Sequence, residues 1–190
     1  MKQTALYYAL DDSPLGLILV AACQQPGSEP AQSLCAVIPG DHQAALLDCL
    51  GQWFPDHQLT PGNEITKALL DSVIRLANAE PLADAPLLTL QGTDFQKQVW
   101  RALLAIPAGE TRSYGQLARQ LGKPQGARAV ASACAANRLA IVVPCHRVVA
   151  ADGKLSGYRW GPHRKQRLLQ QEALRVVADG GMTSGSPVLK

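Results

Sequence analysis

Residues 141–149 read IVVPCHRVV and place a cysteine and a histidine side by side after a short apolar run. The run 141–143 predicts a short buried strand that ends at Pro144, because proline cannot donate a hydrogen bond to a sheet. Cys145 is then expected where the backbone turns. A thiolate is the strongest nucleophile among protein side chains, and a neighbouring base generates it. An inert buried cysteine beside an incidental histidine is the alternative, and the surrounding sequence favours the nucleophile.

The composition is that of an ordinary globular protein of 190 residues, with 47% hydrophobic and 17% charged residues. No run of 18 apolar residues is present and the start lacks a signal peptide's hydrophobic stretch, so we expect no membrane span and a cytoplasmic protein. The five cysteines, at 23, 35, 49, 134 and 145, are odd in number and have no paired short spacing. We therefore expect no disulfide framework, no metal site and no cofactor, in a reducing compartment.

Charge divides the chain into two unlike halves. Residues 1–90 hold three Lys or Arg against ten Asp or Glu, a net charge of −7, whereas residues 91–190 hold fifteen against five, a net charge of +10. A basic half of this kind favours a polyanion such as nucleic acid as its partner. The break falls in a segment with two prolines, 80–86. The expected organisation is a first domain over 1–88, a second over 89–178 and a flexible tail over 179–190.

The sequence pattern of the first half predicts a mixed α/β unit without catalytic residues. Strands are expected over 6–10, 16–22 and 33–38, and helices over 41–53, capped by Asp41, and 64–77. His42 and His57 have no partner ligands in the sequence and are interpreted as surface residues. Cys23, Cys35 and Cys49 are interpreted as small core residues.

The sequence pattern of the second half predicts a helical unit. Thr93 and Ser113 are each followed by glutamine three residues later, a capping-box pattern that predicts two helix starts. The second of these helices is expected to stop at Gly122, and a third follows over 125–136, so the pair fits a helix-turn-helix. A small hairpin or wing is expected over 147–156. Pro162 predicts the first position of a last helix that runs to about residue 177.

The helix over 125–136 is built almost entirely from small residues and carries one arginine, Arg128. A helix that reads the major groove normally presents several long polar side chains to the base edges. Small residues instead allow close approach to a backbone or to the narrow minor groove, with Arg128 inserted. This pattern predicts sequence-independent DNA binding, although small residues also let two helices pack closely.

A nucleophilic Cys145 needs a proton acceptor, and His146 is the nearest candidate in the sequence. Adjacent residues on a strand point to opposite faces, so their contact needs either the turn at Pro144 or a bridging water. The imidazole in turn needs an orienting acceptor. Glu172 is the only acidic residue in the last helix before its end, and it could lie on a partly buried face among leucines. A solvated helix glutamate is the alternative.

Several motifs together resemble the O6-alkylguanine-DNA alkyltransferases, and within that family the C-terminal half of the bacterial adaptive-response regulator. The resemblance covers about residues 5–176, is densest over 93–173, and is carried by YGQLA (114–118), ARAV (127–130), Asn137, PCHRVV (144–149) and GYR (157–159). It implies an α+β fold, with an N-terminal ribonuclease-H-like α/β domain followed by a mostly helical, winged-helix-like domain for DNA binding and catalysis.

The resemblance also implies a direct repair reaction by a monomer. The protein would bind double-stranded DNA through the minor groove and extrude an O6-alkylguanine from the stack, with O4-alkylthymine left open as a second substrate. Cys145 would attack the alkyl carbon, His146 would take the thiol proton through water, and Glu172 would hold the imidazole. Tyr114 is implied as a fourth catalytic residue, which would press on the target phosphate and hydrogen-bond the flipped base. The remaining implied site residues contact DNA or the base or hold the local turn: Ala127, Arg128, Ala129, Asn137, Val148, Tyr158 and Arg159.

The expected product is a thioether, which water does not hydrolyse, so we expect one turnover per molecule. Two alternatives remain: a non-catalytic protein that recognises alkylated DNA, and a fragment of an adaptive-response regulator. The regulator's four-cysteine zinc segment is absent from this sequence, so phosphotriester sensing is not expected, and zinc ligands in the first domain find no match. A Cys-His hydrolase is disfavoured because it has no use for the basic second half.

Overall fold

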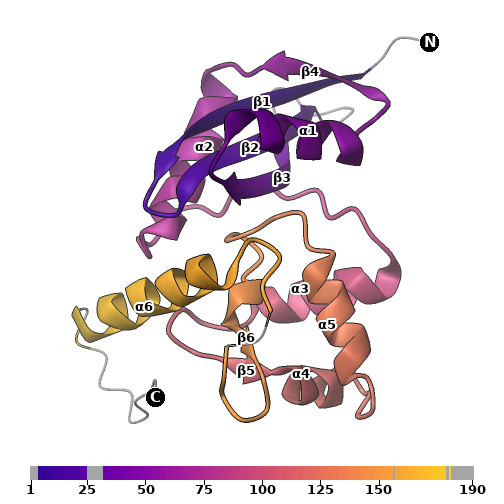
Figure 1. Ribbon diagram of the computed structural model, residues 1–190, viewed down its shortest axis with the longest axis vertical. Helices are drawn as coiled ribbons and strands as arrows, with labels where there is room; N and C mark the ends of the chain where they lie inside the picture. The colour runs from indigo at the N-terminus through magenta and orange to yellow at the C-terminus, as the bar shows by residue number, and fades with distance from the viewer. Residues whose placement is uncertain (1–3, 25–31, 156, 179, 181–190) are drawn as a thin grey trace.

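The computed structural model describes residues 4–24, 32–155, 157–178 and 180. The first half forms a four-stranded sheet with the order β3-β2-β1-β4 (Figure 1). Neighbouring strands are antiparallel, except that β1 and β4 run parallel. The strands are β1 Thr4–Ser13, β2 Gly16–Gln24, β3 Gln32–Gly40 and β4 His57–Pro61.

A helix covers each face of this sheet. Along β2, Ile18 and Val20 belong to the cluster that contains the buried side chains of α2 (Glu64–Ala77), whereas Leu19 and Ala21 pack with those of α1 (Gln43–Trp53). The alternation follows from the two-residue repeat of a strand. Because both faces are buried, the central strands are nearly continuous apolar runs in the sequence.

Over its described residues, the second half contains four α-helices, one 3-10 turn and a short parallel strand pair, β5 with β6. Thr93 and Ser113 form the predicted capping boxes, and Pro162 is the first residue of α6, as predicted. These elements are α3 Asp94–Leu104, β5 Arg112–Ser113, α4 Tyr114–Gln120, α5 Ala127–Ala135, β6 Val148–Val149 and α6 Pro162–Ala178.

Most predicted elements of the first half are confirmed, but two details are corrected. Asp41 does not cap α1, whose N-cap is His42 and has no side-chain cap bond. Asp41 instead accepts a hydrogen bond from Arg164 of α6, which is far away in the sequence. His57, interpreted from the sequence as a surface residue, is half-buried and begins β4, because the parallel pairing with β1 recruits this short segment into the sheet.

The segment before Cys145 is a turn and not the predicted strand. Ile141 has a positive φ of 71°, Val142 N–H donates to Ala140 at 2.7 Å and Val143 N–H donates to Leu139 at 2.9 Å. The apolar run is buried because it lies within the core, not because it joins a sheet. Cys145 opens a single 3-10 turn, Cys145–Arg147.

The predicted hairpin after this turn is also wrong over its described part. β6 pairs with β5, and the returning chain forms no strand among the described residues. It closes a turn with two backbone bonds, from Ala150 N–H to the Lys154 carbonyl and from Gly153 N–H to the Ala150 carbonyl, each at 3.0 Å. Ser156 lies outside the described residues, as does the predicted tail over 179–190 apart from Gly180.

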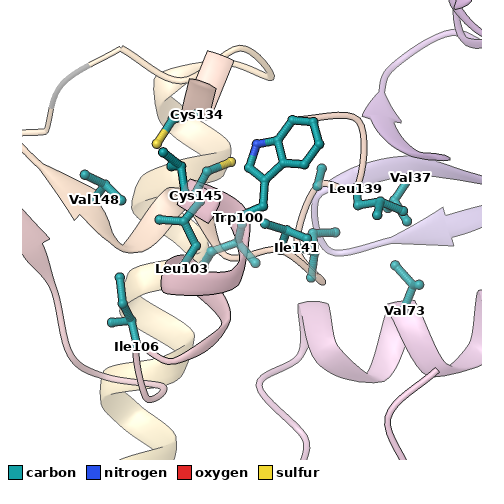
Figure 2. Close-up of a cluster of buried hydrophobic side chains, with 14 of the residues drawn as sticks. Val37, Val73, Trp100, Leu103, Ile106, Cys134, Leu139, Ile141, Cys145 and Val148 are labelled. Carbon is teal, nitrogen blue, oxygen red and sulfur yellow. The ribbon is translucent and has the colours of Figure 1, made fainter. Parts of the chain in front are cut away.

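One hydrophobic core is shared by the two halves. Val37 and Val73 lie on one side of Trp100, while Cys134, Cys145 and Val148 lie on the other side (Figure 2). The free edge of β3 is covered by the segment before α3 and by the segment after α5. Val37 N–H donates to the Arg138 carbonyl at 2.8 Å, and Leu34 N–H donates to the Leu87 carbonyl at 2.8 Å. The covered edge is protected from pairing with other chains.

Arg164 should contribute measurably to the attachment of α6 to the sheet. Its buried guanidinium donates to the carbonyls of Leu15 at 2.7 Å and Trp160 at 2.9 Å and also bonds Asp41. We expect Arg164→Ala to lower the free energy of unfolding by about 2 kcal/mol, because two carbonyls lose their donors. Urea denaturation measures the change. The control, Lys154→Ala, removes an exposed cation paired with Asp152 and should change stability by less than about 0.5 kcal/mol. Equal effects of the two substitutions would contradict the assignment.

Candidate active site

Cys145 lies on the wall of a pocket of about 480 Å³ in the second half. Its side chain is only 6% exposed, so solvent reaches the thiol through this pocket and little else. The 3-10 turn brings the thiol to the pocket, because the chain reverses between the buried apolar run and β6. The pocket is lined by Tyr114, Ala131, Cys134, Ala135, Cys145, Gly157, Tyr158 and Arg159.

Asn137 joins the end of α5 to the turn that carries the thiol. Its buried amide nitrogen donates to the Val143 carbonyl at 2.9 Å and to Cys145 Sγ at 3.2 Å, and its amide oxygen accepts from Leu139 N–H at 2.9 Å. Burial raises the pKa of the Cys145 thiol, and the Asn137 hydrogen bond acts in the opposite direction. Asn137 therefore both fixes the turn and favours the thiolate.

His146 points its Nε2 toward α6, where Glu172 Oε1 accepts a hydrogen bond at 2.8 Å. Both side chains are buried, which confirms the predicted partly buried position of Glu172. With Nε2–H donating to a carboxylate, Nδ1 is the lone-pair nitrogen. Nδ1 is buried and has no hydrogen-bond partner among the described residues. Burial lowers the pKa of His146 despite the nearby carboxylate, so the imidazole is neutral and able to accept a proton at pH 7.

Arg147 completes this network, although the sequence pattern gave it no role. Its Nε and Nη2 donate to Glu172 at 3.1 and 2.8 Å, and Gly109 N–H donates to the same carboxylate at 3.2 Å. Burial by itself would raise the pKa of Glu172, but the hydrogen bonds from His146 and Arg147 and the positive charge of Arg147 outweigh it and lower the pKa to about 2. The carboxylate is therefore ionised and fixed by several donors.

Lys165 of α6 is a further residue that sequence reasoning missed. It is fully buried and its ammonium donates to the Val148 carbonyl at 2.5 Å. Burial lowers the pKa of Lys165, and its positive charge acts to lower the pKa of Cys145. A lysine in a helix that is otherwise rich in Arg and Gln gives no sequence signal for burial, so only the fold places it beside the thiol.

The other sequence-predicted residues fall into two groups. Tyr114, Tyr158 and Arg159 line the pocket with Cys145, and the Tyr158 hydroxyl is buried there without a hydrogen-bond partner among the described residues. The second group is Ala127, Arg128 and Ala129, which lie at the start of α5 and outside the pocket lining, with Arg128 exposed. Val148 is buried in β6 and is not among the residues that line the pocket; its carbonyl accepts the hydrogen bond from Lys165.

No group of three or more His, Cys, Asp or Glu side chains could hold a metal ion within the described part of the chain. Over the same residues, no helix is both long and apolar enough to cross a bilayer.

Removing the Asn137 amide should raise the pKa of Cys145. Because this donor favours the thiolate, we expect the pH profile of iodoacetamide alkylation at Cys145 to move to higher pH in Asn137→Ala. Unfolding should also become easier by about 1–3 kcal/mol, since the Leu139 and Val143 backbone groups lose a partner. Peptide mapping identifies the cysteine that carries the label. Cys134→Ala serves as the control, because it removes the other thiol of the pocket. An unchanged pH profile would show that the amide does not act on the sulfur.

Glu172 should make stability depend on acid pH. Its pKa lies near 2 in the folded protein against an ordinary value of 4.5, so its contribution is present above pH 4.5 and is lost as pH falls toward 2. We therefore expect Glu172→Gln to be less stable than wild type at pH 5 and to lose less further stability between pH 5 and pH 3. Urea unfolding at both values measures this. The matched control, Glu110→Gln, removes an exposed carboxylate paired with Arg112 and should follow the wild type.

Known proteins resemble this chain in sequence and in fold. The family model described as "6-O-methylguanine DNA methyltransferase, DNA binding domain" matches residues 94–174. The chain is 49% identical over 175 residues to the "Bifunctional transcriptional activator/DNA repair enzyme Ada" of Escherichia coli, covering 90% of this chain and 47% of that protein. It is 59% identical over 92 residues to the "Methylated-DNA--protein-cysteine methyltransferase" of Mycobacterium bovis, covering 48% of this chain and 56% of that protein.

A solved structure extends the match to the whole fold. The crystal structure of Mycobacterium tuberculosis O6-methylguanine methyltransferase superposes with a TM-score of 0.70 at 37% identity, covering 90% of this chain and 94% of that one. The same TM-score and identity hold for a structure of that organism's protein in complex with DNA, with 89% and 94% covered. The chain spans about half the length of the curated relatives it matches. The shared α+β fold and the identity over nearly the full length of a solved relative show that this chain belongs to the O6-methylguanine methyltransferase family.

Proposed function

We propose that this chain repairs DNA by direct reversal, transferring an alkyl group from guanine O6 in duplex DNA to Sγ of Cys145. The observation that carries this proposal is the position of the thiol. It lies on the wall of a pocket and accepts a hydrogen bond from the Asn137 amide. The next residue, His146, forms a buried pair with Glu172 of α6. The names of the relatives, which specify methylated DNA and a protein cysteine, support the same assignment.

The reaction balances without a cofactor. The sulfur forms a bond to the alkyl carbon while the bond from that carbon to guanine O6 breaks, and the electron pair leaves with the guanine. The thiol proton passes through a bridging water to Nδ1 of His146, the nitrogen that has no partner among the described residues. Glu172 holds the opposite nitrogen and stabilises the imidazolium. The Tyr114 hydroxyl, on the pocket wall, donates to the departing guanine, a donor of this type being worth roughly 3 kcal/mol.

The product is a thioether on Cys145. Cleaving that carbon–sulfur bond would need a second activated nucleophile aimed at the alkyl carbon. Burial and the neighbouring Cys145 raise the pKa of the other pocket thiol, Cys134, to about 12, so it is protonated at neutral pH and a poor nucleophile. Each molecule therefore acts once, and the protein itself is the final alkyl acceptor.

DNA is proposed to meet the exposed side of α5 through its minor groove. Ala127 and Ala129 allow close approach, and Arg128 enters the stack in place of the extruded guanine. Tyr158 walls the pocket that receives the base. The absence of long polar side chains on this face, apart from Arg128, supports binding without sequence preference. O4-alkylthymine is a second candidate substrate of the same pocket.

We also propose the finer architecture implied by the family resemblance. The order β3-β2-β1-β4 with one parallel pair supports a ribonuclease-H-like first domain over 1–88, and the α4–α5 pair followed by β6 supports a winged-helix-like second domain over 89–178. The working form is a monomer in the cytoplasm, since a single chain supplies every group named above and the thiol must stay reduced.

Stoichiometry tests the reaction. Incubation with an excess of duplex DNA containing O6-methylguanine should add one methyl group, 14 Da, to the peptide that holds Cys145, and each protein molecule should repair one lesion. Intact-protein and peptide mass spectrometry measure the methyl group, and nuclease digestion of the DNA measures the remaining lesion. Cys145→Ser should bind the duplex and leave the methyl group in place.

The same experiment separates the alternatives. Tight binding by the wild type without transfer would indicate a non-catalytic recognition protein. Methyl recovered on another residue, or more lesions repaired than protein molecules present, would overturn the mechanism proposed above. A fragment of a regulator would still transfer the methyl group, and would differ only in the segments joined to it.

A further inference from the structure

Arg159 lies at the rim of the Cys145 pocket. It belongs to the pocket lining, yet its side chain is exposed to solvent. Its Nη1 donates to the carbonyl of Ala135, the last residue of α5, at 3.2 Å. This is its one hydrogen bond within the described part of the chain, so most of its N–H donors are available to a ligand.

Aromatic side chains hold this guanidinium in place. Its carbon lies 4.8 Å from the ring centroid of Trp53 and 5.3 Å from that of Trp160, within the range of a cation–π interaction. The two indoles contact each other edge to face at 5.9 Å. Trp53 is the last residue of α1, so the first half of the chain contributes directly to the rim of a pocket in the second half.

The position of Arg159 relative to α5 indicates what it could bind. Arg128 lies near the start of α5 and Ala135 at its end, about 10 Å further along the axis at 1.5 Å per residue. Between them the exposed or partly exposed side chains are small. Arg159, bonded to Ala135, therefore places a second cation at the opposite end of the face that carries Arg128. When a base enters the pocket, its sugar and phosphates remain at the rim, where Arg159 is held.

We propose that Arg159 binds a backbone phosphate next to the extruded nucleotide, and that Trp53 is the positioning residue that holds its guanidinium for this contact. The inference rests on the proposed DNA repair function and adds to it a role for the first half of the chain. A planar guanidinium suits phosphate because it can donate two parallel hydrogen bonds. Fixing it against two rings lowers the entropy lost when the phosphate binds.

Salt dependence of DNA binding tests the contact. The measurement uses Cys145→Ser protein and a labelled duplex containing O6-methylguanine, with fluorescence anisotropy from about 50 to 200 mM NaCl. We expect Arg159→Ala to weaken binding by about tenfold and to reduce the slope of log K against log [NaCl] by about 0.9, the value for one phosphate contact. Lys154→Ala, which removes an exposed cation paired with Asp152, should leave the slope unchanged. An unchanged slope in Arg159→Ala would overturn the proposal.

A double-mutant cycle tests the positioning role of Trp53. We expect Trp53→Leu to weaken binding by several-fold, and to add nothing further when Arg159→Ala is already present. Trp53→Phe keeps an aromatic face and should fall between wild type and Trp53→Leu. Thermal melting verifies that each variant is folded. Independent, additive losses would show that Trp53 acts only on stability, and would overturn its positioning role.

A second readout separates this inference from the proposed reaction. In proteins that keep Cys145, the rate of iodoacetamide alkylation at the thiol should change by less than about twofold in Arg159→Ala, because that reagent has no phosphate. Methyl transfer from subsaturating DNA should slow by about tenfold, in line with the loss of affinity. Equal slowing of both reactions would show that Arg159 acts on the reactivity of the thiol, and would overturn the phosphate contact. Failure of the wild type to transfer methyl would overturn the proposed reaction alone, since the binding measurement does not need it.

Discussion

The carboxylate of Glu172 is the group on which the geometry of the site depends. It accepts hydrogen bonds from His146, Arg147 and Gly109, and so ties the 3-10 turn and the segment after α3 to α6. A buried carboxylate is stable only when its lone pairs are satisfied, so these donors must be present together. The same bonds orient the imidazole and leave Nδ1 as its acceptor. Stability and chemistry are therefore set by one ionised group, and changes to it affect both.

Burial places two opposing demands on the thiol. A dry site strengthens every electrostatic interaction with the reacting atoms, but it also disfavours the thiolate that must form there. Two groups offset this cost: the Asn137 amide is a direct donor to the sulfur at 3.2 Å, and the buried ammonium of Lys165, which donates to the Val148 carbonyl, adds its positive charge. In the proposed reaction, a neutral His146 takes the proton when substrate is present. The arrangement fits a nucleophile that is protonated at rest and is activated only with an electrophile in the pocket.

The sequence predicted features that are encoded locally. The capping boxes at Thr93 and Ser113 and the start of α6 at Pro162 each depend on residues within one helical turn, and all three are confirmed. The turn at Ile141 was missed, since a short apolar run is equally compatible with a strand and with a buried turn. The partners of Arg147, Lys165 and Arg164 were also missed. Those contacts join residues between 17 and 149 positions apart, and their formation depends on how α6 packs rather than on any nearby pattern.

The two halves differ in charge, yet their packing makes them mechanically one unit. They share a hydrophobic core around Trp100, and the free edge of β3 pairs with the segment before α3 and with the segment after α5. Because packed interiors transmit displacement rather than absorb it, a shift of α1 would move Trp53 and, through it, Arg159 at the rim of the pocket. In the proposal made above, the acidic half would assist DNA binding without supplying the phosphate-binding cation, because Trp53 would fix the direction of Arg159, which the basic half carries.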